Sequence, residues 1–162
     1  MTLDLKEIKP ITDILGYAVL DSQKLEYSLA FMMLMLNNEL NLSNNEHDEK
    51  IDNYMQSLSK KTLGNLTKQL QEIVTVSEGF KEKLESALDA RNYLIHKFFH
   101  EQGENLLTIN GREKALLLVK EKRKKLFDCY VFLDPFIKAL MEIKGINAEN
   151  LNGEIERKYE KG

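Results

Sequence analysis

Residues 80–100 read FKEKLESALDARNYLIHKFFH, and this stretch decides the fold class. Its apolar residues recur three, four or seven positions apart, which is the spacing of one face of an α-helix. They are Phe80, Leu84, Ala87, Leu94 and Phe98. A stripe of this length predicts a long helix from about Glu78 to His100 that buries one side against other helices.

Other parts of the chain have the same periodicity, so we expect an all-α, single-domain up-down bundle of four to five helices. The further helices are expected at about Thr12 to Leu40, about Thr62 to Val74 and about Asn110 to Lys144, with a short amphipathic piece at about Glu49 to Leu58. Residues 31–36 are apolar on every side, which predicts that the first helix is centrally buried. The core spans about residues 12–144, and the tail 145–162 is weakly patterned.

Several residues predict where these helices end. Gly103 is expected to end the 78–100 helix in a left-handed conformation, and Gly145 to terminate the last helix. Asn110 and Glu113 have the spacing of a capping box at the start of that last helix. Pro135 lies inside it and predicts a kink.

The composition is that of a globular protein. The chain has 162 residues, of which 43% are hydrophobic, and a net charge of −3. No apolar run is long enough to span a membrane, and residues 1–10 do not resemble a secretory signal, so a cytoplasmic location is expected. The single cysteine, Cys129, excludes an internal disulfide and predicts a buried apolar filler. No phosphate-binding loop or dinucleotide motif occurs, so no cofactor is expected.

Residues 120–125 concentrate positive charge. Lys120, Lys122, Arg123, Lys124 and Lys125 provide five cations in six positions. One interpretation is a solvated helix face. The other is an electrostatic track that steers RNA toward a functional site.

Arg91, Asn92 and His96 bring a cation, an amide and an imidazole to the same helix. Cleavage of RNA without a metal needs a base for the ribose 2′-hydroxyl and an acid for the leaving oxygen, and histidine suits both tasks. An arginine fork binds two phosphate oxygens at once. Arg91 and His96 are five residues apart, about 140° around an ideal α-helix. One copy of the chain would therefore direct them poorly at a single phosphate.

The motif R-N-x-x-x-H, preceded by Ala87-Leu88 and followed by Phe98-Phe99, resembles the R-x(4–6)-H signature of HEPN domains, small helical ribonucleases and toxins of prokaryotes. The resemblance implies a metal-independent endoribonuclease of a toxin–antitoxin or phage-defence system, with RNA as substrate and an antitoxin protein as partner. It also implies a homodimer that pairs the two motif helices. Arg91 would bind phosphate, His96 would act as acid or base, and Asn92 would orient one of them.

One departure concerns regulation. HEPN toxins that nucleotidyltransferase antitoxins neutralise commonly carry a modified tyrosine two residues after the histidine, where this chain has Phe98. The resemblance in fold and ribonuclease activity remains, but control by modification at that position is put in doubt.

Two other residues are supporting candidates. Glu26 lies beside the apolar seam of the first helix, and we expect it to form a salt bridge with Arg91. His100 follows His96 at i+4, a spacing also found in metal sites, but no third ligand is evident and no metal is expected.

A structural role accounts for the same motif. Arg91 would then pair with an acid of another helix, and His96 would fill a half-polar seam. In that case the chain is a non-catalytic helical dimer that acts as a protein-interaction module, or a regulatory partner that binds nucleotide or blocks another protein.

Overall fold

The computed structural model describes residues 4–40 and 49–147, which form helices and no strand. The helices are α1 (Leu5–Leu36), α2 (Glu49–Ser59), α3 (Leu63–Ile73), α4 (Glu78–Asn92), α5 (Phe98–Gln102) and α6 (Ile109–Ile143). A π-helical turn, η1 (Tyr93–Lys97), joins α4 to α5, and a 3₁₀ turn, η2 (Asn105–Leu107), precedes α6. The predicted all-α class is confirmed.

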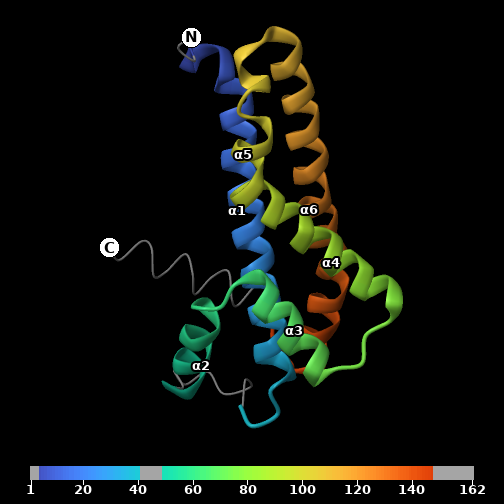
Figure 1. Cartoon of the computed structure of the whole chain (residues 1–162). Helices are drawn as coiled ribbons and strands as arrows, with labels where there is room; N and C mark the ends of the chain where they lie inside the picture. Colours follow the sequence, from blue (N-terminus) through green and yellow to red (C-terminus); the bar gives the residue numbers. More distant parts are fainter. Residues whose placement is uncertain (1–3, 41–48, 148–162) are drawn as a thin grey trace.

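The two longest helices, α1 and α6, lie side by side and run in the same direction (Figure 1). Three contacts along them define this register. The Glu7 carboxylate lies 3.0 Å from Arg112, Asp21 accepts a 2.8 Å hydrogen bond from Arg123, and Asn38 accepts a 3.1 Å bond from Lys144. The path from α4 through η1 to α5 runs the opposite way, while α2 and α3 pack near the C-terminal end of α1.

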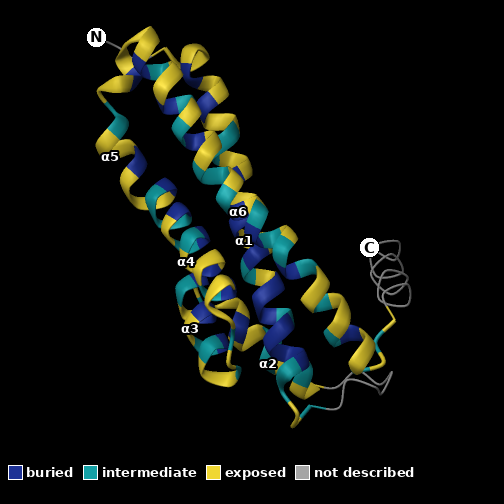
Figure 2. Ribbon diagram, turned by 90° about the vertical axis from the view of Figure 1, so that its right-hand side faces the viewer, coloured by how far each residue is buried: buried dark blue, intermediate teal, exposed yellow. Residues whose placement is uncertain are grey.

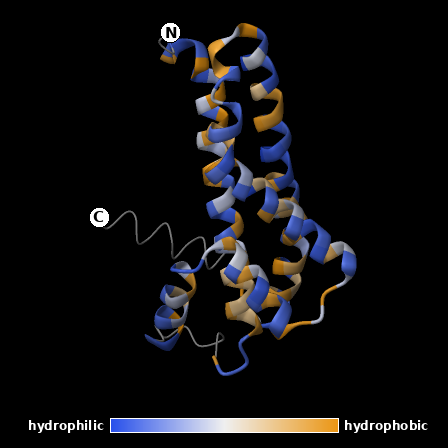
Figure 3. Ribbon diagram, in the orientation of Figure 1, coloured by the Kyte–Doolittle hydropathy of each residue, from blue (hydrophilic) through white to orange (hydrophobic). Residues whose placement is uncertain are grey.

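The core follows the predicted stripes. All five apolar residues of the 80–98 stripe are buried, as are Met32 to Met35 in α1. Figure 2 shows that this second half of α1 is the most continuously buried stretch of the bundle. Hydrophobic and hydrophilic residues alternate along the long helices in Figure 3, as expected for helices that bury one side.

Helix α1 differs from the prediction at both ends. It begins at Leu5 instead of Thr12, because the Asp4 side chain caps it by accepting a 2.9 Å bond from the Lys6 amide. The added turns bury Ile8 and Ile11, which offsets the hydrogen bond missing at Pro10. The helix ends at Leu36 instead of Leu40, and the residues that follow the predicted end, 41–48, lie outside the described residues.

Two predicted caps are wrong. Gly103 has φ of −53°, because the chain turns directly into η2 without a left-handed residue. A side chain at this glycine is excluded for another reason: a Cβ would lie 2.8 Å from the Phe99 carbonyl oxygen. The capping box of Asn110 and Glu113 does not form, since Thr108 caps α6 and accepts a 3.1 Å bond from the Gly111 amide.

The other end of α6 lies close to the predicted one. Pro135 lies within the helix, which continues past it to Ile143, and Gly145 follows with φ of 68°. The kink expected at Pro135 stays a prediction. Cys129 is fully buried, as predicted, and burial raises the pKa of its thiol from 9.0 to about 11. Among the residues that the structure describes, no helix is long and apolar enough to cross a membrane.

Candidate functional site

A π-helical turn sits at the centre of the motif. Helix α4 keeps ordinary geometry as far as Asn92, and the following turn, η1, contains one extra residue. The Phe98 amide therefore donates to the Tyr93 carbonyl, five residues earlier. Turns of this kind are uncommon within α-helices and occur often at functional sites, because they aim side chains where an α-helix would not.

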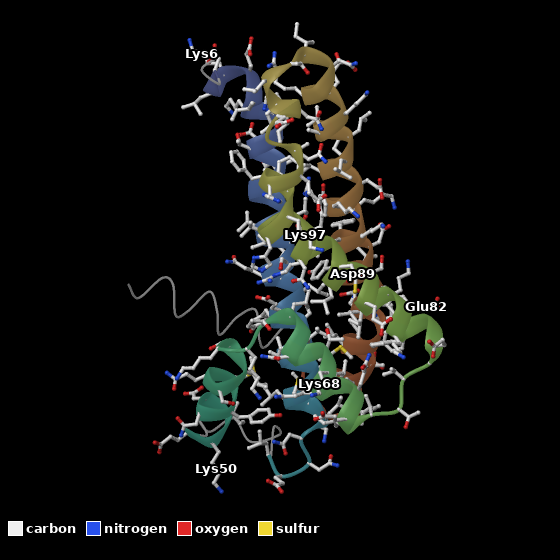
Figure 4. All side chains as sticks on the ribbon, in the orientation of Figure 1. Lys6, Lys50, Lys68, Glu82, Asp89 and Lys97 are labelled. Carbon is white, nitrogen blue, oxygen red and sulfur yellow. The ribbon has the colours of Figure 1, made fainter. Side chains whose placement is uncertain are left out.

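The π turn brings Arg91 and His96 together. Nη1 of Arg91 lies 3.3 Å from Nε2 of His96 and donates a 3.2 Å hydrogen bond to Oδ1 of Asn92. The divergence of about 140° expected for an ideal α-helix is therefore wrong for this helix, since a π turn brings residues five apart close together. Asp89 and Lys97, which flank these residues in the sequence, are labelled in Figure 4. The divergence of Arg91 and His96 is therefore no longer a reason to expect a homodimer.

The contact favours one tautomer of His96. A guanidinium has only donors, so a hydrogen bond between the two groups requires Nε2 to accept. That is the tautomer with its proton on Nδ1. The amide oxygen of Asn92 accepts a hydrogen bond from the arginine, and the orienting role expected for Asn92 stays a prediction.

Arg91 has no counter-ion among the described residues. It contacts the Asn92 oxygen and the His96 nitrogen, and its Nε atom is buried without a hydrogen-bond partner. A half-buried cation without a carboxylate is uncommon, because desolvation of the charge is not offset. The positive charge of Arg91 could therefore be met by an anionic group.

Glu26 does not pair with Arg91, which corrects the prediction. Its Oε1 atom accepts a 3.1 Å bond from the Leu63 amide at the start of α3. The free N–H groups at a helix N-terminus and the helix dipole attract a carboxylate, and α3 packs on α1 close to Glu26. Glu26 also lines a cavity of about 510 Å³ between α1, α2 and the start of α3.

His100 is exposed on α5, one turn beyond His96. Within residues 4–40 and 49–147, no group of three histidine, cysteine, aspartate or glutamate residues could hold a metal ion.

The basic run divides between two sides of α6. Lys122 lies over the Tyr93 ring of η1, with its Nζ atom 5.0 Å from the ring centroid. Arg123 instead faces α1, where it donates to Asp21 and lies 5.0 Å above the Tyr17 ring. Lys120, Arg123 and Lys124 line a pocket of about 260 Å³ with Ile14 and Phe127. Of the five cations, Lys122 is the one that contacts η1.

Two of these cations have partners on their own helix. Lys124 pairs with Asp128, and Lys125 pairs with Glu121, each at i,i±4 spacing. Such exposed pairs are weak. The side chains of residues 120–125 therefore do not form a continuous positive track. Lys120 and Lys124 are exposed and line the same pocket.

A polar chain behind η1 was not predicted. The Tyr93 hydroxyl accepts a 3.2 Å bond from Gln102, whose amide oxygen accepts a 2.8 Å bond from Asn105. Partial burial raises the pKa of Tyr93, with Gln102 acting in the opposite direction and Glu101 adding to the rise. These residues connect the π turn to η2. Their spacing in the sequence carries no signal of this, because it does not show the π turn that lies between Tyr93 and Gln102.

In comparisons with known proteins, no family model, curated protein or solved structure matches this chain.

Proposed function

We propose that this protein is a metal-independent endoribonuclease of the HEPN type. The observation that carries the proposal is the 3.3 Å approach of the Arg91 guanidinium to His96, with no carboxylate of residues 4–40 or 49–147 paired to the arginine. A cation next to an imidazole suits a phosphodiester, since one group binds the phosphate and the other exchanges a proton.

In the proposed reaction, Arg91 donates to the non-bridging oxygens of the scissile phosphate. Its Nη atoms would bind two such oxygens as a fork. When the guanidinium turns from His96 to the phosphate, Nε2 of His96 is released and takes the proton of the ribose 2′-hydroxyl, and the 2′-oxygen attacks phosphorus. The bond to the 5′-oxygen breaks, which leaves a 2′,3′-cyclic phosphate on one product and, after protonation, a 5′-hydroxyl on the other.

The leaving 5′-oxygen needs an acid, and the neutral His96 of one copy cannot fill both roles in the same step. We propose that a second copy provides it, in a homodimer that pairs the two motif helices. This part rests on the resemblance of the R-N-x-x-x-H motif to that of HEPN domains.

The biological setting in this proposal is a toxin–antitoxin or phage-defence system in the cytoplasm, with an antitoxin protein as partner. The exposed rim of Lys120 and Lys124 supports attraction of RNA, because positive side chains without buried partners are available to phosphates. Their pocket lies against α1, so they would act in steering and not at the cleavage site.

The test is cleavage of single-stranded RNA in EDTA by the purified chain. We expect 2′,3′-cyclic phosphate ends, and a loss of about 10²–10⁴-fold in rate for His96→Ala, the range of general acid–base catalysis. Ile143→Ala is the control, since Ile143 is exposed at the far end of α6 and the variant should cleave like wild type. Equal activity of wild type and His96→Ala would refute the proposal.

A second candidate is a non-catalytic helical interaction or regulatory module. It is favoured by an exposed stripe on α1, where Tyr17, Leu20 and Tyr27 are 54%, 51% and 63% exposed. Loss of partner binding in Leu20→Asp, in a chain that cuts no RNA, would support this candidate.

A further inference from the structure

An exposed patch lies directly beside the proposed cleavage site. It consists of four exposed residues of η1 and α5, in which two adjacent pairs are separated by one helical turn: Ile95, His96, Phe99 and His100. Phe99 is 73% exposed, the highest value for any phenylalanine of the chain, and Ile95 is 45% exposed. An aromatic ring in such a position is not explained by the packing of the bundle.

The contrast with other rings shows that Phe99 is outside the core. Phe80, Phe132 and Phe136 form a cluster with centroids 5.2 to 5.5 Å apart. The neighbouring Phe98 is 3% exposed. Phe99 takes part in none of these ring contacts, so its ring has a free face.

The backbone under the ring is nevertheless fixed. The Phe99 carbonyl accepts a 2.9 Å bond from the Gly103 amide, and the absence of a side chain at Gly103 allows this close approach. The backbone of Phe99 is thus held in a helix, and the ring moves mainly by rotation about its own χ angles. An exposed aromatic on a fixed backbone is pre-organised for stacking, which reduces the entropy lost on binding.

Polar groups around Phe99 suit a nucleic-acid strand. Lys97 is exposed and positively charged, and His96 and His100 are exposed and carry ring nitrogens that can form hydrogen bonds. Glu101, the acidic residue of α5, interacts with the Tyr93 hydroxyl. Proteins bind single-stranded nucleic acid with an aromatic ring on which bases stack, next to side chains that contact phosphates.

The spacing also fits. Three residues of helix separate Phe99 from His96, about 4.5 Å along the axis. Successive bases in a nucleic-acid strand rise by about 3.4 Å. A base stacked on Phe99 would therefore belong to a nucleotide next to the phosphate held by Arg91 and His96.

We propose that Phe99 is a stacking platform for an unpaired base adjacent to the scissile phosphate, so that the substrate is single-stranded and not duplex RNA. This inference rests on the proposed ribonuclease function and specifies its substrate class. Phe99 is here a specificity-determining residue and not a group that moves protons.

The chain contains no tryptophan, which gives a direct test. Phe99→Trp in a His96→Ala background introduces a single indole at the platform of a non-cleaving protein. A single-stranded oligoribonucleotide should quench its fluorescence saturably, whereas a blunt RNA duplex should not. Ile143→Trp in the same background is the matched control, because Ile143 is 76% exposed at the far end of α6. Its emission should not respond.

Affinity provides a second readout. Phe99→Ala, in the His96→Ala background, should weaken binding of the single strand by about 5- to 150-fold, the range for loss of one base–aromatic stack. Phe99→Tyr should retain most of the affinity, and Ile143→Ala should retain all of it. In the cleaving protein, Phe99→Ala should raise KM more than it lowers kcat.

The outcomes separate this inference from the proposed function. If wild type cleaves, His96→Ala does not, and Phe99→Ala binds and cleaves like wild type, the nuclease stands and the platform is refuted. If RNA quenches the fluorescence of the Phe99→Trp variant but the wild-type protein cleaves no RNA, base stacking on Phe99 is supported and the nuclease function is refuted. If the indole emission instead changes with protein concentration in the absence of RNA, and Phe99→Ala lowers the mass measured by light scattering, Phe99 lies in an interface between copies and the inference is overturned.

Discussion

Nη1 of Arg91 lies 3.3 Å from Nε2 of His96, so an exposed histidine faces a group that can only donate. We expect long-range ¹H–¹⁵N NMR spectra to show the proton of the His96 tautomer on Nδ1. Arg91→Ala should release this preference, because the donor to Nε2 is removed. His100, which has no such partner among the described residues, is the internal control and should not change. A wild-type His96 protonated on Nε2 would contradict the contact.

Arg123 should matter for stability more than its charged neighbours. Its partner Asp21 has a side chain only 8% exposed, so Arg123→Gln leaves a buried carboxylate without its cation. We expect the free energy of unfolding to fall by about 1–3 kcal/mol in urea titrations. Lys124→Gln removes an exposed pair with Asp128 on the same helix and should change it by at most about 1 kcal/mol. Equal effects would argue against the Asp21 contact.

Glu26 should act as a cap of α3 and not as a partner of Arg91. Glu26→Ala removes the acceptor for the Leu63 amide, and we expect a loss of about 0.5–2 kcal/mol in thermal unfolding. Glu26→Gln keeps an acceptor oxygen and should retain most of that stability. Both variants should leave the NMR signals of His96 unchanged. A shift of those signals in Glu26→Gln would place the carboxylate near Arg91 after all.

Two glycines should respond to alanine with opposite signs. At Gly103 a Cβ would lie 2.8 Å from the Phe99 carbonyl oxygen, so Gly103→Ala should destabilise the protein by about 1–3 kcal/mol as the backbone shifts. At Gly79, within α4, nothing lies within 4 Å of a Cβ. Gly79→Ala should therefore stabilise the protein by about 0.5–1 kcal/mol through helix propensity. Urea unfolding of the two variants checks both signs.

Cys129 should be inert in the folded protein. Burial raises the pKa of its thiol to about 11, so at pH 8 only about one thiol in a thousand is ionised, and it is also inaccessible. Alkylation by iodoacetamide should follow unfolding. Because the folded pKa is raised above 9.0, the thiol contributes stability that is full below pH 9 and is lost as pH rises toward 11. Cys129→Val should lack this part of the alkaline decline, and a decline identical to wild type would contradict it.

The helical class and the buried faces of the helices could be predicted from local sequence patterns. Helical periodicity is local, since residues three and four apart lie on one face whatever surrounds the helix. The stripe from Phe80 to Phe98 and the apolar middle of α1 were therefore predicted correctly, and so was the burial of Cys129. The end of the last helix near Gly145 was also predicted, because glycine adopts a positive φ more readily than other residues.

The contacts of the candidate site residues depend on tertiary packing, and the sequence did not predict them. The π turn at Tyr93–Lys97 adds one residue to a turn, which no apolar spacing indicated, and it reverses the expected divergence of Arg91 and His96. Glu26 could have met several cations from sequence alone. Its actual partner, the Leu63 amide, depends on how α3 packs on α1. Likewise, the register of α1 against α6 directs Arg123 to Asp21 while Lys122 faces Tyr93. Partners of charged groups are chosen by helix packing between distant segments, which local patterns do not encode.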